Sequence, residues 1–197
     1  VFGNPPWCNF NNLPQEYKPF IKGVFEQYDL ITSKKSLLLG CSRMDIAALI
    51  IAKVMKDFLV SKGNAYFFAP LSLLLNEGAH NSFRKFKIHN IEYALKSVYD
   101  FCEEKIFENV STRYGLIHLK RNEISKYPVL YYKLEAQNWE KYYAKPIFNK
   151  DEPLSVFKTN EGEAFKNIKK IQLPQESIPR QGINTCGANY IYFFDKC

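Results

Sequence analysis

The sequence predicts an α/β fold, and three observations support that prediction. An apolar segment with helical spacing, residues 45–59, leads into a short apolar run, residues 65–69, which a proline ends. This order of helix and buried strand is typical of an α/β crossover unit. Two later segments, residues 113–121 and 129–135, alternate apolar and polar side chains as half-exposed strands do. With 197 residues and 46% hydrophobic content, the chain can bury one substantial core.

The chain begins with VFGNPPWCNF, in which two consecutive prolines separate an asparagine from a tryptophan. Pro5 and Pro6 fix two φ angles and remove two backbone donors, so the apolar residues before them are expected to end a strand. A turn after that strand explains the prolines but leaves Asn4 and Trp7 unexplained. An amide or acid followed by Pro, Pro and an aromatic residue arises by chance in about one chain in a hundred of this size. NPPW is therefore a candidate functional motif.

Two helices are expected next. Residues 15–28 form a predicted helix whose interior Pro19 and Gly23 weaken. The second helix is expected to begin after Asp45 as its N-cap and to end before Gly63, and the strand at residues 65–69 follows it.

The second half of the chain is less regular. LSLLLNEGAHNSFRKF predicts an interrupted helix, and IEYALKSVYDF begins as a strand. NEISKYP separates the two alternating strands, which predicts an antiparallel strand pair at a sheet edge. Residues 136–160 show no reliable periodicity. Residues 161–170 predict a short helix, and residues 188–195 a final strand after the turn INTCGAN.

Composition restricts the partners. Lys and Arg total 27 against 20 Asp and Glu, a formal net charge of +7 that favours a polyanionic partner, although a solvated face is the more ordinary explanation of each basic group. The five cysteines lack CxxC spacing and the three histidines form no HxxxH arrangement, so no metal site or disulfide framework is predicted. A reducing compartment, the cytoplasm, is expected. No apolar run reaches transmembrane length, and no membrane partner is expected.

The order of these motifs resembles the catalytic part of an adenine-specific DNA methyltransferase. NPPW is followed by MDIAALIIAK, GNAYFFAPLSLL, NSFRKF, KIFENVSTRYGLIHLKR and finally QGINTCGANYIYFF. More narrowly, the chain is similar to the large type IIG and type I-like methylases of restriction-modification systems. The resemblance covers nearly the whole chain and is weakest at residues 136–160. It implies the C-terminal half of a Rossmann-like class I methyltransferase sheet with an antiparallel edge strand pair, followed by the start of a target-recognition region.

The resemblance implies methyl transfer from S-adenosylmethionine to the exocyclic N6 amine of adenine in double-stranded DNA. That amine is a poor nucleophile, because its lone pair is delocalised into the ring. The side-chain oxygen of Asn4 and the backbone carbonyl of Pro5 can each accept a hydrogen bond from one of its N–H groups, which frees the lone pair. Pro5 and Pro6 hold these acceptors still. The target base must flip out of the duplex, and Trp7 supplies a ring on which it stacks.

The resemblance also implies further site residues. Phe107 corresponds to a second aromatic contact with the flipped base, and its other interpretation is a core residue that anchors a loop. Asp45 corresponds to a position that contacts the adenosyl part of the cofactor, although helix capping explains it equally well. Several turn residues match the junction into a target-recognition domain, where they approach DNA, and a plain hairpin turn is the alternative. These are Gly182, Asn184, Thr185, Gly187 and Asn189.

The sequence departs from the family in its cofactor site. The glycine-rich loop that grips S-adenosylmethionine is not found, and Gly3 and Gly40 do not stand in for it. The chain also starts at Val1, without an initiator Met, in what looks like the end of a strand. We therefore expect a fragment of a longer polypeptide that is inactive alone. The missing part of that polypeptide, or a restriction or specificity subunit, is the expected protein partner.

Within the fragment, residues 1–135 are expected to form the catalytic half of the methyltransferase domain. Residues 136–197 are expected to form the remainder of that domain and the junction to a target-recognition domain.

Two alternative functions remain open. NPP followed by an aromatic residue also serves methylation of glutamine amides in proteins and of guanine amines in RNA. Those enzymes usually have Tyr or Phe in place of Trp7 and lack a GINT-type junction. The second alternative is a catalytically inactive DNA-recognition module of methyltransferase lineage. The intact NPPW argues against a loss of catalytic activity. The sequence upstream of Val1 would discriminate between an active enzyme and an inactive module, because it shows whether the cofactor loop is present.

Overall fold

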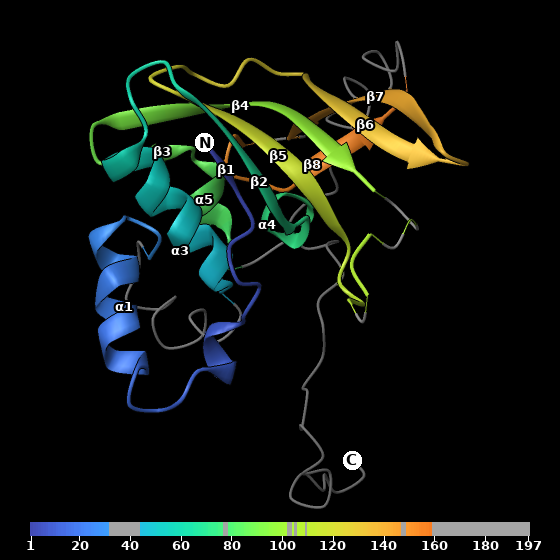
Figure 1. Ribbon diagram of the computed structural model, residues 1–197. Coiled ribbons are helices and arrows are strands. Elements are labelled where there is room, and N and C mark those ends of the chain that lie inside the picture. The colour runs from blue at the N-terminus through green and yellow to red at the C-terminus, as the bar shows by residue number, and fades with distance from the viewer. Residues whose placement is uncertain are drawn as a thin grey trace, which may run out of the picture. The chain divides into compact units, whose positions relative to one another are not determined.

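An eight-stranded mixed sheet forms the centre of the structure. Its strands lie in the order β1-β2-β5-β4-β6-β7-β8, and β3 pairs with β4. The computed structural model describes residues 1–31, 44–76, 79–101, 104, 106–108, 110–146 and 149–158, all within the unit Val1–Gly162. In Figure 1 the helices of this unit lie on one side of the sheet. The α/β class predicted from the sequence is confirmed.

Parallel and antiparallel pairs are combined in this sheet. The pairs β1·β2 and β4·β6 are parallel, and the other pairs among the described strands are antiparallel. Parallel neighbours need a crossover connection, and α1 and α3 lie between β1 and β2 in the chain, as the predicted α/β unit requires. The strands are β1 Phe2–Gly3, β2 Asn64–Pro70, β3 Lys87–Ile88, β4 Ile91–Asp100, β5 Tyr114–Arg121, β6 Val129–Glu135, β7 Asn138–Pro146 and β8 Leu154–Phe157.

The helices begin where the local sequence provides a cap or a proline. The Asp45 side chain accepts the N–H of Ala47 at 2.8 Å, which confirms Asp45 as the N-cap of α3. Helix α1 begins later than predicted, so Pro19 lies in its first turn, where no backbone donor is needed, rather than in its interior. The helices are α1 Lys18–Gln27, α3 Ile46–Lys53, α4 Ser72–Leu75 and α5 Asn81–Arg84, with the 3-10 helix η1 Phe10–Asn12 and the π-helical turn η3 Val54–Phe58.

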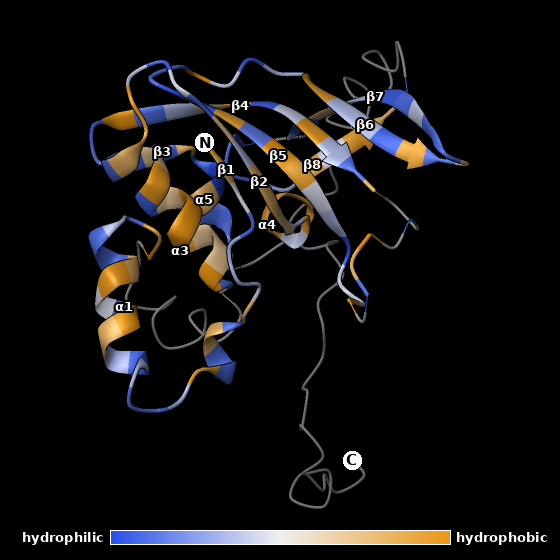
Figure 2. Cartoon of the chain, viewed as in Figure 1, coloured by the Kyte–Doolittle hydropathy of each residue, from blue (hydrophilic) through white to orange (hydrophobic). Residues whose placement is uncertain are grey.

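The core lies between α3 and the central strands. Ala47 and Ile51 of α3 are fully buried, and Phe67 of β2 and Ile117 of β5 are at most 2% exposed. Figure 2 shows α3 largely in the apolar colour, which is typical of a helix buried on most of its surface. Among the described residues, no helix combines the length and the apolar character that crossing a membrane requires.

The predicted antiparallel pair of residues 113–121 with 129–135 is wrong. These segments form β5 and β6, but β4 lies between them, antiparallel to β5 and parallel to β6. Neighbours in sequence usually pair in a sheet, and the expectation rested on that rule. Here β5 instead fills the position between β2 and β4, so it is an interior strand. An antiparallel pair does lie at a sheet edge, but it consists of β7 and β8.

Strands β7 and β8 lie in the segment where the sequence shows no periodicity. A two-residue turn, Ala136 and Gln137, joins β6 to β7, and both residues have positive φ, 48° and 66°. Two positive φ angles suit the right-handed twist of a hairpin, but Asn and Gly are the residues that normally signal such a turn. An Ala-Gln turn therefore escapes detection from the sequence.

His80 is the basis of a pH prediction. It is 7% exposed, and its Nδ1 atom has no hydrogen-bond partner among the described residues. Burial, with a smaller effect of the Arg84 charge, lowers the pKa of His80 from 6.5 to about 4. Between these two values the unfolded chain binds a proton that the folded chain does not. The stabilisation from a neutral His80 is therefore complete above pH 6.5 and is lost as the pH falls towards 4.

We expect the free energy of unfolding to fall by about 3 kcal/mol over this pH range on account of His80. Urea titrations at several pH values measure this fall. His80→Gln keeps a polar side chain without the titration, so its stability should depend less on pH in the same range. An identical pH dependence in both proteins would assign the fall to other groups.

Candidate functional site

NPPW lies beside the C-terminal ends of strands β1 and β2. β1 ends at Gly3, immediately before the motif, and β2 ends at Pro70. β5 starts at the same end of the sheet, with Tyr114 opposite Pro70. β4 finishes there, with Asp100 opposite Gly115. The connection from β4 to β5 therefore starts and finishes beside NPPW. In open α/β sheets, ligands bind beyond the carboxyl ends of parallel strands, which is where this motif lies.

The two acceptors expected in the motif differ in exposure. Asn4 is exposed, and no hydrogen bond in the described part of the chain uses its side-chain amide. Pro5 is buried, whereas Pro6 is exposed and Trp7 is half-buried. The buried proline fixes the backbone, and the amide before it points to solvent with its hydrogen-bonding capacity unused.

The segment after Trp7 is fastened to the start of α3. The N–H of Ile46 donates to the carbonyl of Cys8 at 2.9 Å, and the N–H of Phe10 donates to the carbonyl of Met44 at 2.8 Å. Strand β1 holds the other end of the motif. NPPW is therefore fixed on both sides by regular structure before any ligand binds.

Asp45 takes part in this attachment as the cap of α3. Burial raises the pKa of the Asp45 carboxyl, and hydrogen bonds from the N–H groups of Ala47 and Cys8 oppose that rise. The capping interpretation of Asp45 is confirmed. Its contact with a cofactor stays a prediction.

Trp7 is held in an aromatic cluster. Its indole N–H donates to the carbonyl of Phe68 at 3.2 Å. Its ring centroid lies 5.2 Å from that of Tyr114 and 5.5 Å from that of Phe107, and the Phe107 ring is nearly perpendicular to it, at 87°. Phe68 also meets Phe107 at 87° with the centroids 5.5 Å apart. We call Trp7, Phe68, Phe107 and Tyr114 the aromatic site.

Sequence reasoning placed Trp7 and Phe107 in one site, and the structure brings them into contact. It missed Phe68 and Tyr114, because each lies in a segment with an ordinary strand pattern. The register of β2 against β5, which places Pro70 opposite Tyr114, is what brings them to NPPW. That register depends on long-range pairing, and no local signal indicates it.

The other predicted site residues lie outside the described part of the chain. Gly182, Asn184, Thr185, Gly187 and Asn189 belong there, as do the helix predicted at residues 161–170 and the strand predicted at 188–195. Their proximity to DNA stays a prediction.

The described residues do not provide a complete site for S-adenosylmethionine. Four glycines lie among them, and the two nearest the motif serve strand packing. A Cβ atom on Gly3 would lie 3.0 Å from the Phe67 ring, and one on Gly115 would lie 2.6 Å from the carbonyl oxygen of Tyr99. Neither belongs to a glycine-rich turn that lets a cofactor approach the backbone.

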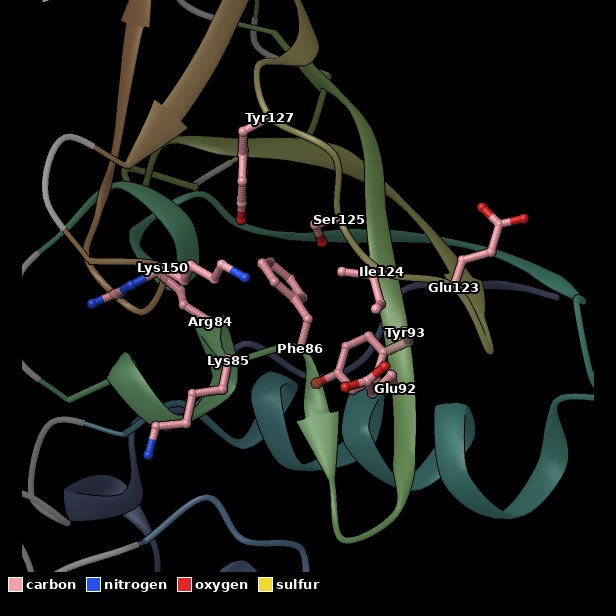
Figure 3. A pocket seen from close by; sticks show the side chains of 10 residues that line it. All are labelled: Arg84, Lys85, Phe86, Glu92, Tyr93, Glu123, Ile124, Ser125, Tyr127 and Lys150. Carbon is pink, nitrogen blue, oxygen red and sulfur yellow. The ribbon is translucent and has the colours of Figure 1, made fainter. Parts of the chain in front are cut away.

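A cavity of about 150 Å³ lies near the start of β4, at the end of that strand opposite to NPPW. Figure 3 shows Phe86, Tyr127 and Lys150 around it, with Tyr93 at the lower side. The Tyr93 hydroxyl is buried and has no hydrogen-bond partner among the described residues, and burial raises the pKa of Tyr93. The length of β4 separates this cavity from NPPW, so it does not belong to the candidate site.

The buried hydroxyl has a testable effect on stability. We expect Tyr93→Phe to raise the free energy of unfolding by about 1 kcal/mol, since it removes a polar group that lost its water without gaining a partner. Tyr131→Phe is the matched control, because the Tyr131 hydroxyl donates to Asp100 at 2.6 Å and its loss should destabilise the protein. Urea midpoints compare the two variants. A less stable Tyr93→Phe protein would show that the hydroxyl is satisfied in solution.

No family model and no curated protein matches the chain. Similar solved structures include methyltransferase subunits and enzymes of restriction-modification systems. The type ISP restriction-modification enzyme LlaGI, a nuclease-deletion mutant in complex with a DNA substrate mimic, has a TM-score of 0.49 and 17% identity, with 77% of this chain and 17% of that chain covered. The type IIL enzyme MmeI in complex with DNA has a TM-score of 0.46 and 14% identity, with 74% and 18% covered.

The methyltransferase subunit of a type I system from Streptococcus thermophilus has a TM-score of 0.39 and 17% identity, with 86% of this chain and 30% of that chain covered. The chain thus spans less than a third of the length of each of these similar chains.

Proposed function

We propose that the chain is part of a site-specific DNA methyltransferase that acts on the exocyclic N6 amine of adenine within a restriction-modification system. The observation that carries this proposal is the NPPW loop itself. It is fixed at the carboxyl end of a strand, it presents an exposed amide at Asn4, and it places Trp7 against Phe107. Double-stranded DNA is the proposed substrate, and a restriction or specificity subunit is the proposed protein partner.

In this proposal Asn4 and Pro5 act on the amine. The Asn4 side-chain oxygen and the Pro5 carbonyl accept hydrogen bonds from its two N–H groups. These hydrogen bonds pull the nitrogen towards tetrahedral geometry and make its lone pair available. Rigid acceptors suit this role, because they need no reorganisation as charge develops. The hydrogen bonds between the segment after Trp7 and the start of α3 supply that rigidity.

The aromatic site receives the flipped base. A base stacked between two rings needs about 7 Å between the ring centroids, twice the ordinary carbon contact distance. Trp7 and Phe107 are 5.5 Å apart and touch each other directly. We therefore place the adenine on the exposed part of the Trp7 ring, with the Phe107 ring packed nearly perpendicular against Trp7. Stacking of this kind contributes about 1–3 kcal/mol per base.

S-adenosylmethionine is the proposed methyl donor. The described residues offer one candidate contact for it, Asp45, and no glycine-rich turn. Methyl transfer by the whole protein is therefore a proposal about the full-length polypeptide, and the described residues hold and polarise the acceptor amine.

The test is methyl transfer by the full-length protein. Duplex DNA is incubated with the protein and methyl-labelled S-adenosylmethionine and then digested to nucleosides, and we expect the label in N6-methyladenine. Label on protein glutamine or on RNA guanine, with none in DNA, would favour the alternative N-methyltransferases. DNA binding without any methylation would identify an inactive recognition module and contradict the proposal.

A further inference from the structure

One hydroxyl group holds the turn that carries Phe107. The Tyr114 hydroxyl oxygen accepts the N–H of Ile106 at 2.7 Å and the N–H of Phe107 at 3.2 Å. It donates its own proton to the carbonyl of Glu104 at 3.2 Å. A phenol has one donor and can accept two hydrogen bonds, so the hydrogen-bonding capacity of this hydroxyl is fully used.

Tyr114 also contacts both aromatic partners of the turn. Its side chain is 6% exposed, and its ring centroid lies 5.1 Å from that of Phe107 and 5.2 Å from that of Trp7. The ring thus contacts both Trp7 and Phe107, while the hydroxyl forms hydrogen bonds with the backbone of the turn. Packing and hydrogen bonding come from separate parts of one side chain.

The two ends of the β4–β5 connection are fixed independently of Tyr114. Asp100, the last residue of β4, is fully buried and accepts hydrogen bonds from Arg113 Nε at 3.1 and 3.2 Å. Tyr131 donates to the same carboxylate at 2.6 Å, and the carbonyl of Arg113 accepts the N–H of Leu71 at 3.0 Å. Tyr114 follows directly after this anchor, so the position of its hydroxyl is set by the sheet.

We propose that Tyr114 is a positioning residue, whose hydroxyl sets Phe107 against Trp7 before the base arrives. This inference rests on the proposed function, because it assigns Tyr114 to the binding of a flipped adenine. A turn ordered in advance spares the base the entropy of ordering it, and binding strengthens by the fraction of molecules already in the competent arrangement. Tyr114 need not touch the substrate to have this effect.

The experiment compares full-length wild type, Tyr114→Phe and Tyr93→Phe. Tyr114→Phe keeps the ring and its packing but removes all three hydrogen bonds to the turn. Tyr93→Phe is the matched control. The Tyr93 hydroxyl lies near the start of β4, far from the turn, and has no partner among the described residues. Three quantities are measured: amide hydrogen exchange at Ile106 and Phe107, extrusion of 2-aminopurine at the target adenine of a duplex, and KM and kcat for that duplex.

For Tyr114→Phe we expect exchange at the two amides to accelerate at least about tenfold, since their acceptor is gone. We expect extrusion to weaken and KM to rise by about tenfold to thirtyfold, while kcat stays within about threefold, because the substitution lowers the competent fraction and leaves the chemistry intact. Tyr93→Phe should match the wild type in all three quantities. A merely structural role for Tyr114 would not divide KM from kcat in this way.

The outcomes separate the two proposals. If the wild type extrudes and methylates adenine and Tyr114→Phe does so with an unchanged KM, the positioning role is overturned and the proposed function stands. Faster exchange without a change in KM also overturns it, because the hydroxyl would then serve only the fold. A wild type that neither extrudes nor methylates adenine overturns the proposed function and the role of Tyr114 with it.

Discussion

Asn4→Ala in the full-length protein is expected to lower the rate of methyl transfer to duplex DNA by at least about a hundredfold. The substitution removes the side-chain oxygen that polarises the amine, and losing one preorganised partner of a reacting group costs about 10²–10³ in rate. DNA affinity should change little, because phosphate contacts supply most of it and Asn4 makes none in this mechanism. Single-turnover methyl transfer measures the rate, and fluorescence anisotropy measures the affinity.

Asn12→Ala is the matched control, since Asn12 is another exposed asparagine close to the motif in sequence. It should leave both the rate and the affinity unchanged. Asn4→Asp adds a second test, because it keeps an acceptor oxygen at the same place, and it should retain more activity than Asn4→Ala. Methyl transfer within about tenfold of wild type in Asn4→Ala would remove Asn4 from the mechanism.

The parts of the fold that the sequence predicts correctly are those with a local physical cause. Two prolines end β1, a carboxylate placed to bond the N–H of Ala47 starts α3, and a proline ends the apolar run of β2. Each of these signals acts within a few residues. For the same reason, NPPW is identified before the structure is known, because its rigidity is a property of four consecutive residues.

The parts that the sequence did not predict depend on pairing between distant segments. The position of β4 between β5 and β6 depends on which strand edges remain unpaired when the sheet assembles. The local sequence of residues 113–135 does not indicate that position. The Ala136-Gln137 turn carries no hairpin signal, so β7 was missed. The aromatic site is predicted only in part, since Phe68 and Tyr114 join it through register rather than through a motif.

Trp7→Ala is expected to weaken extrusion of the target adenine by about 1–3 kcal/mol, or about fivefold to 150-fold in the extrusion equilibrium. The reason is the loss of the ring face on which the base stacks. Trp7→Phe should keep most of the extrusion, because a phenyl ring still offers a face. It loses the hydrogen bond from the indole N–H to the Phe68 carbonyl, so we expect it to lie between wild type and Trp7→Ala. A fluorescent adenine analogue at the target position measures extrusion in the full-length protein.

Trp139→Ala is the control for the loss of a tryptophan as such. Trp139 is 45% exposed on β7 and contacts Phe101 and Tyr99, and it is not among the residues that touch Trp7 in the described part of the chain. Its removal should leave extrusion at the wild-type level. Equal extrusion signals for wild type and Trp7→Ala would refute the stacking role, and the aromatic site would then serve only to fasten NPPW to the sheet.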